Sequence, residues 1–228
     1  MGLFDILKKK DINDNGNYLY TDKEIKEYKK YITSQLGEID CVFSEIVSDE
    51  IKLDVLIIAP TKENNYYKLV TMGMGAYKMN VPKELQKYQF ERSELIIYLP
   101  PDWDIKSKED KDYWPIRQLK TLARLPIQSN SWLGLGHTVS NDAKNSPYAD
   151  NTKLCSMLLL FAFNNGYNTI KEFNFRKNEK INFYQLFPIY EDELNYIFNN
   201  NWYDFIDLAG DSIVMPIDIN RDSFIKKK

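Results

Sequence analysis

The single histidine, His137, is the first residue whose chemistry could serve catalysis. It follows the glycine-rich stretch Gly134-Leu135-Gly136, and together with Trp132 it marks a shaped turn. One histidine cannot build a two-histidine metal site, and no Gly-x-Ser-x-Gly nucleophile motif accompanies it. A structural histidine that donates to a backbone carbonyl is therefore the favoured interpretation. The alternative is an enzyme in which His137 works with a carboxylate such as Asp54 or Glu94.

Other candidate chemistry is equally sparse in this sequence. The stretches Gly73-Met74-Gly75 and Gly134-Leu135-Gly136 lack the third glycine of a dinucleotide-binding loop, and no P-loop lysine is present. Bends or bulges in strands explain both stretches. Cys41 and Cys155 stand far apart and outside any Cys-x-x-Cys pair, which is neither a disulfide framework nor a zinc site. We therefore expect a non-enzyme with no catalytic residues, no metal, no cofactor and no small-molecule substrate.

Charge and length limit the classes of partner. The chain has 228 residues, and its 30 basic and 33 acidic side chains give a net charge of -3. No overall field therefore attracts nucleic acid or anionic lipid. The longest strongly apolar stretch, residues 154–163, is about half the length of a membrane-spanning helix, and the first residues match neither a secretion signal nor a myristoylation motif. We expect a cytoplasmic protein without a membrane partner.

The more informative feature is regional. Residues 181–220 contain no lysine or arginine, but they contain seven acids and nine aromatic rings. Acidic side chains interleaved with rings suit an interface with a basic protein. The alternative is that the rings pack the last helix onto a sheet while the acids form its solvated side. The residues predicted to bind a partner are Glu191, Asp192, Glu193, Trp202, Tyr203, Asp204, Asp207 and Asp211.

Hydrophobic periodicity predicts the elements that must position these residues. Thr21 and Glu24 form a capping box, which predicts a helix over 22–36. A second helix over 112–125 has Pro115 in its first turn and ends at Pro126. Predicted strands cover 42–46, 51–59, 67–74, 94–99, 154–163 and 182–187, and a last helix begins near Glu191. This order predicts a mixed α/β (α+β) fold, a largely antiparallel sheet flanked by helices.

We expect one domain over residues 21–220, with a polar, amphipathic segment at 1–20 and a basic tail at 221–228.

Several blocks of the sequence, taken in order, resemble the suppressor-of-fused (SUFU)-like domain, and the likeness covers about residues 40–210. The blocks are Asp49-Glu50-Ile51-Lys52-Leu53-Asp54-Val55, Thr71-Met72-Gly73-Met74-Gly75-Ala76-Tyr77, Met79-Asn80-Val81-Pro82, Glu94 to Trp103, Tyr113 to Arg117, Leu122 to Pro126, Trp132 to Thr138, Asn151 to Cys155, and Leu186 to Leu194. The resemblance implies a mixed α/β domain without established catalytic residues. It also implies protein binding, since animal members sequester a transcription factor and some bacterial members neutralise polymorphic toxins. The chain resembles a single-domain bacterial member, so the animal proteins' clamp between two domains is not carried over.

Three functions remain open from the sequence. The first is an immunity protein, or antitoxin, that binds a cognate bacterial toxin, with a nuclease as the toxin class that an acidic aromatic face would suit. The second is a regulatory module that captures a peptide by adding it to a sheet edge. The third is the enzyme that uses His137 with a carboxylate.

Overall fold

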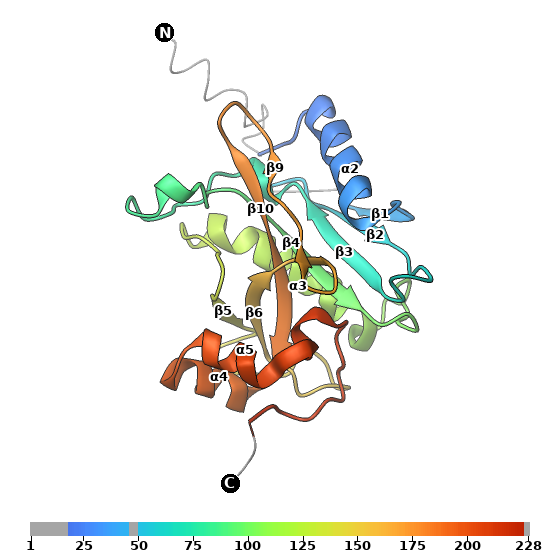
Figure 1. Cartoon of the computed structure of the whole chain (residues 1–228), viewed down its shortest axis with the longest axis vertical. Helices are drawn as coiled ribbons and strands as arrows, with labels where there is room; N and C mark the ends of the chain where they lie inside the picture. The colour runs from blue at the N-terminus through green and yellow to red at the C-terminus, as the bar shows by residue number, and fades with distance from the viewer. Residues whose placement is uncertain (1–17, 46–49, 226–228) are drawn as a thin grey trace.

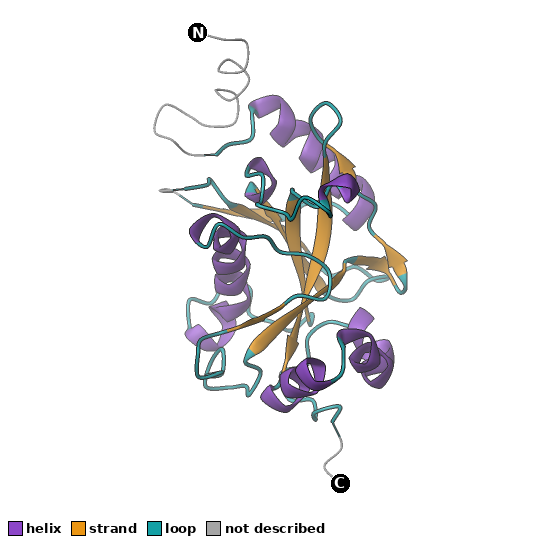
Figure 2. Cartoon of the chain, turned by 90° about the vertical axis from the view of Figure 1, so that its left-hand side faces the viewer, coloured by secondary structure: helices purple, strands orange, loops and turns teal. Residues whose placement is uncertain are grey.

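A mixed β-sheet forms the centre of the protein and has helices on both faces (Figures 1 and 2). The computed structural model describes residues 18–45 and 50–225, so predictions for residues 1–17, 46–49 and 226–228 lie outside the described residues. The strands of the main sheet are β1 (Cys41–Ser44), β2 (Asp54–Ile58), β3 (Tyr67–Met72), β4 (Ser93–Leu99), β5 (Thr138–Ser140), β6 (Ser156–Phe161), β9 (Phe173–Asn174) and β10 (Lys180–Ile189). Their order is β1-β2-β3-β4-β10-β6-β5, with β9 beside β10. Only β4 and β10 run parallel among the described pairs, which confirms the predicted fold class.

Helices cover both faces of the sheet. Helix α3 (Asp110–Gln128) packs on one face, against side chains such as Val55 and Ile57 of β2. Helix α2 (Asp22–Leu36) packs on the other face, against Leu56 and Ile58. Successive side chains of a strand point to opposite faces. Because both faces are covered, the central strands are apolar along almost their whole length.

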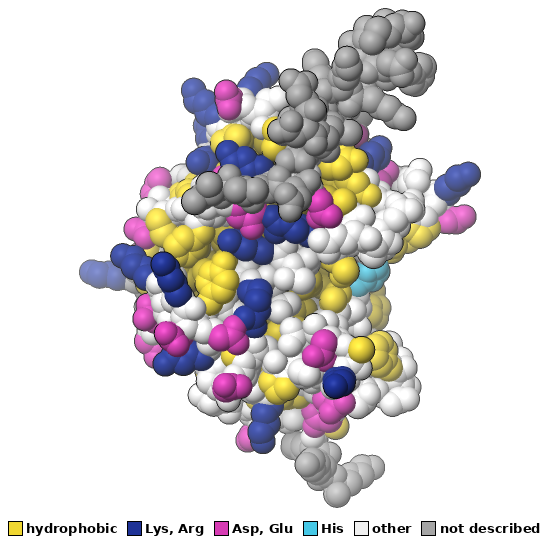
Figure 3. Space-filling view, turned by 180° about the vertical axis from the view of Figure 1, so that it is seen from behind, with side chains coloured by type: hydrophobic (Ala, Val, Ile, Leu, Met, Phe, Trp, Pro, Cys, Tyr) yellow, Lys and Arg dark blue, Asp and Glu magenta, His cyan; other side chains and the backbone are white. Residues whose placement is uncertain are grey.

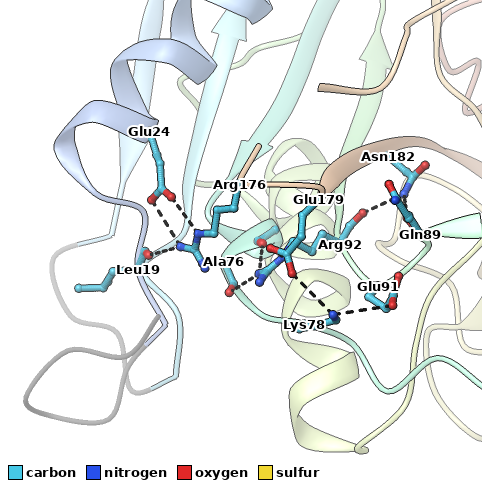
Figure 4. Close-up of polar contacts among 11 residues, drawn as sticks. Leu19, Glu24, Ala76, Lys78, Gln89, Glu91, Arg92, Arg176, Glu179 and Asn182 are labelled. Carbon is cyan, nitrogen blue, oxygen red and sulfur yellow. Dashed lines mark hydrogen bonds and ion pairs between the residues drawn. The ribbon is translucent and has the colours of Figure 1, made fainter. Parts of the chain in front are cut away.

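The predicted boundaries of the first helix are confirmed. Thr21 accepts from the backbone N–H of Glu24, and the Glu24 side chain accepts from the backbone N–H of Thr21 in return. Each bond satisfies a donor that the helix leaves unpaired. A partly buried ion pair links this helix to the turn between β9 and β10, because Arg176 donates to Glu24 at 2.8 Å (Figure 4). Beside it, Arg92 donates to Glu179 of the same turn at 3.0 Å and so ties the turn to the start of β4.

The predicted end of the second helix is wrong, because α3 continues through Pro126 to Gln128. Proline here removes one hydrogen bond from the last turn only, and its ring is buried in the core. Pro115 leaves the Lys111 carbonyl without its helical donor, and the side chain of Asn151 donates to this oxygen at 3.1 Å.

The last predicted helix is two helices, α4 (Glu191–Asn199) and α5 (Trp202–Ala209), followed by a 3-10 turn, η3 (Gly210–Val214). The chain breaks between them at Asn200, and Asn201 caps α5 by accepting from the backbone N–H of Asp204 at 2.8 Å. Both helices pack on β6 and β10, on the same face of the sheet as α2.

Four shorter features were not predicted. They are the edge strand β5, the two-residue strand β9, a small hairpin of β7 (Phe163–Asn165) and β8 (Asn168–Thr169), and two further 3-10 turns, η1 (Met74–Ala76) and η2 (Gln86–Tyr88).

Candidate functional site

The shaped turn and the acidic aromatic segment, predicted separately, meet in the structure. Gly136 has a φ of 80°, and a Cβ atom there would lie 2.4 Å from Nε1 of Trp202, the first residue of α5. At Gly134 a Cβ atom would lie 2.3 Å from the ring of Trp132. Glycine is therefore required at both positions for these rings to pack against the turn. The Gly-x-Gly stretch thus holds α5 beside the turn.

A groove lined by aromatic rings runs between the turn and α5. It has a volume of about 480 Å³. Its apolar lining includes Phe90, Trp132, Leu135, Phe161, Trp202 and Tyr203. Phe161 and Tyr203 are 52% and 62% exposed, which is unusual for large rings. The rings support one another, since Trp202 stacks on Tyr203 at 3.7 Å between centroids and Trp132 lies parallel to Phe90 at 6.4 Å.

The solvent side of α5 continues this surface with alternating apolar and acidic side chains. Tyr203, Asp204, Asp207 and Leu208 are all exposed, and residues four apart on a helix lie on one face. Asp211 follows in η3, where it accepts a hydrogen bond from the Tyr167 hydroxyl. We call these five residues, Tyr203, Asp204, Asp207, Leu208 and Asp211, the α5 face. On the face of the molecule opposite to the view of Figure 1, acidic and basic side chains are interspersed (Figure 3).

The three acids at the start of α4 were all predicted to bind a partner, but they differ in exposure. Glu191 is exposed and accepts from Asn145 at 3.2 Å, and Asp192 is half-buried. Glu193 was grouped with the surface acids, but its side chain is fully buried. The prediction that Glu193 binds a partner is therefore wrong, because a buried carboxylate is not part of a contact surface.

Glu193 is held by Arg221, a residue that the sequence assigned to the basic tail. The guanidinium donates to the two carboxylate oxygens at 2.6 and 2.7 Å. Backbone N–H groups of Tyr190 and Phe224 donate to the same carboxylate, each at 2.9 Å. The Arg221 guanidinium also lies over three rings, those of Phe187, Tyr190 and Phe224. The arrangement is a fork-like buried ion pair that fixes residues 221–225 on α4.

The ring of His137 lies against the ring of Trp132. The two rings are 4.3 Å apart and nearly perpendicular. Burial lowers the pKa of His137, and a hydrogen bond with the backbone of Trp132 opposes this shift. The lowered pKa keeps the ring neutral at neutral pH.

Glu94, one of the two carboxylates considered for His137, is fully buried in β4 and is committed to other partners. It accepts from the hydroxyls of Tyr20 at 2.6 Å and Thr71 at 2.5 Å, and from the backbone N–H groups of Gly73 and Gly75 at 2.8 and 3.1 Å. Burial raises its pKa, although these four donors oppose the shift. We predicted a bend at Gly73-Met74-Gly75. The structure shows that the amides of this bend bind the protein's own carboxylate, as a phosphate-binding nest binds an anion.

Two further findings concern ligands and membranes. Within residues 18–45 and 50–225, no three histidine, cysteine or carboxylate side chains are grouped so that they could hold a metal ion. No helix in the same residues is long and apolar enough to cross a membrane.

Comparison with known proteins decides the family. A sequence model of the suppressor of fused protein (SUFU) matches residues 49–222, about three-quarters of the chain. The chain belongs to the SUFU family. This confirms the resemblance of its sequence blocks. An uncharacterised protein of Ureaplasma parvum serovar 3 is 28% identical over 213 residues, which cover 92% of this chain and 100% of that protein.

Solved SUFU structures share the fold. A putative SUFU homologue from Neisseria gonorrhoeae has a TM-score of 0.61 at 17% identity, over 92% of this chain and 98% of that one. The structure of a Sufu–Fu complex gives 0.59 at 14% identity, over 88% and 90%. Drosophila Suppressor of Fused gives 0.58 at 14% identity, over 88% of this chain and 50% of its own.

Proposed function

We propose that this SUFU-family chain is a protein-binding module that neutralises a cognate bacterial toxin by covering a basic surface of it. The observation that carries the proposal is the α5 face, which presents three carboxylates with Tyr203 and Leu208 exposed between them. No basic residue within residues 181–220 competes for these acids. Exposed rings supply contact area, and carboxylates select and steer a positively charged partner.

Three further observations support protein binding over catalysis. The ring of His137 packs on Trp132, and the hydrogen bonds described for Glu94 come from Tyr20, Thr71, Gly73 and Gly75. One of the solved structures that share the fold is a Sufu–Fu complex, in which that SUFU protein binds another protein. A toxin that acts on nucleic acid needs a basic surface for its polyanionic substrate, and an acidic face that covers this surface would block it.

Co-expression tests this proposal in cells. The chain is expressed with the toxin-like product of an adjacent gene, and growth is compared for the wild type and for Asp204→Lys/Asp207→Lys. We expect the wild type to restore growth and the charge-reversed variant to fail. The matched control is Glu63→Lys/Asp150→Lys, which makes the same change in net charge at two exposed acids outside the α5 face.

Equal protection by the charge-reversed variant and the control would refute the role of α5. It would favour capture of a peptide at a sheet edge, because backbone hydrogen bonds at an edge need no acidic face.

A further inference from the structure

The ring-lined groove beside α5 has the features of an anchor pocket. Phe161 and Tyr203 line the groove, and each exposes more than half of its surface. The groove volume of about 480 Å³ can accept a large side chain with room to spare. Exposed rings at the mouth of an apolar groove are costly in water. A partner that fills the groove would remove this cost.

The groove itself does not select a charge. Lys171 and Glu172 both lie along it, and Glu172 is already paired with Lys180 at 2.9 Å. The two charged lining residues, Lys171 and Glu172, are opposite in sign, and most of the other lining residues are rings or the aliphatic side chains of Leu135 and Ile170. The occupant that fits best is therefore an uncharged, bulky side chain.

The selection for charge lies immediately next to the groove. Tyr203 lines the groove and also belongs to the α5 face, so the groove and the carboxylates of Asp204 and Asp207 are parts of one continuous surface. A side chain in the groove would thus bring its neighbours in the partner's chain to the acids. Lysine or arginine at those positions would complement them.

One ring of the groove, that of Trp202, already has packing partners within the chain. Trp202 packs on the backbone of Gly136, stacks on Tyr203, and starts a helix that Asn201 caps. Ordered rings lose little conformational entropy on binding, which favours such a groove as a binding hot spot.

We infer that the groove receives one bulky apolar side chain of the partner protein, and that basic residues flanking this side chain pair with the α5 face. This inference rests on the proposed binding function and specifies the chemistry of the partner.

Capped pentapeptides titrated into the full chain test the inference, with the indole N–H signals of its tryptophans followed by NMR. The probes are Lys-Lys-Leu-Lys-Lys, the same peptide with alanine in place of leucine, and Glu-Glu-Leu-Glu-Glu. We expect the leucine peptide with lysines to shift the indole signals of Trp132 and Trp202, and to bind about tenfold more tightly than either other peptide. Trp114, which is buried in the core, should not respond.

Two variants sharpen the test. Phe161→Ser removes an exposed ring of the groove and should weaken the leucine peptide about tenfold. Met215→Ser removes an exposed apolar side chain elsewhere and should leave its affinity unchanged. Equal affinity for the leucine and alanine peptides, or a leucine peptide that leaves both groove indoles unmoved, would overturn the inference.

The inference and the proposed function can fail separately. If Phe161→Ser binds the cognate toxin as tightly as the wild type does, while Asp204→Lys/Asp207→Lys loses binding, the groove inference is wrong and the proposed function stands. If the groove selects the leucine peptide but no toxin is neutralised, the proposed function is wrong and the groove stands.

Discussion

Replacing Arg221 tests how much its buried ion pair with Glu193 contributes to the free energy of unfolding. The variant Arg221→Met keeps a long apolar side chain that can pack near the rings of Phe187 and Phe224, but it leaves the Glu193 carboxylate without a counter-charge. Glu193 is 0% exposed and the Arg221 side chain is 12% exposed, so water replaces little of the lost interaction. Breaking one side of such a pair destabilises a protein by about 3 to 5 kcal/mol.

Urea unfolding followed by circular dichroism measures this change. We expect Arg221→Met to lower the free energy of unfolding by about 3 to 5 kcal/mol. The double variant Glu193→Met/Arg221→Met should recover a large part of the loss, because it removes both charges together. The control is Lys23→Met, which breaks a surface pair with Glu27 whose side chains are 83% and 53% exposed. Surface helix pairs of this kind contribute about 0.3 to 0.5 kcal/mol.

A loss below about 1 kcal/mol for Arg221→Met would refute this reasoning, because it would place the pair in the range of surface pairs. A double variant that loses the sum of the two single losses would also contradict it, since the two residues would then act independently.

Three further predictions concern the turn and the buried carboxylate. Gly136→Ala should lower the free energy of unfolding by about 2 kcal/mol or more in urea, because a Cβ would strike Trp202 at a φ of 80°; the control Gly166→Ala, with open space around its Cβ position, should lose only about 1 kcal/mol. Glu94→Gln should have a smaller free energy of unfolding than the wild type. This difference should shrink as the pH rises above 4.5, because the pKa of the folded Glu94 carboxyl is raised and its ionisation therefore lowers the stability of the wild type. The wild type should lose stability as the pH falls below 6.5, because the lowered pKa of the folded imidazole of His137 opposes its protonation. His137→Gln has no group that titrates at this position, so it should not show this loss. A gap that widens with pH for Glu94→Gln, or parallel curves for His137→Gln and the wild type, would contradict these assignments.

Local signals in the sequence predicted the elements well. The capping box at Thr21 and Glu24 fixes the start of α2 through bonds between near neighbours, so it can be recognised without knowledge of the fold. The apolar runs of the central strands reflect burial on both faces, and their order predicted the sheet. The break between α4 and α5 was missed, although Asn201 three residues before Asp204 is a capping signal.

The site could be predicted only in part, because its geometry depends on residues distant in sequence. The aromatic content of residues 181–220 indicated Trp202 and Tyr203, but the groove is also lined by Phe90 and Phe161. Glu193 was assigned to the surface because its counter-charge, Arg221, lies outside that segment. Pairing of this kind depends on how the chain returns to α4, which composition and periodicity do not encode.

The affinity of the purified chain for its cognate toxin, measured by calorimetry at two salt concentrations, tests the central claim most directly. For the wild type we expect a tight one-to-one complex that weakens as salt rises, because exposed charges are screened. Asp204→Lys/Asp207→Lys should bind at least about tenfold more weakly, a loss of about 1.4 kcal/mol, while Glu63→Lys/Asp150→Lys should bind like the wild type. Equal affinities for all three proteins, with no dependence on salt, would contradict the assignment of the α5 face as the surface that binds protein.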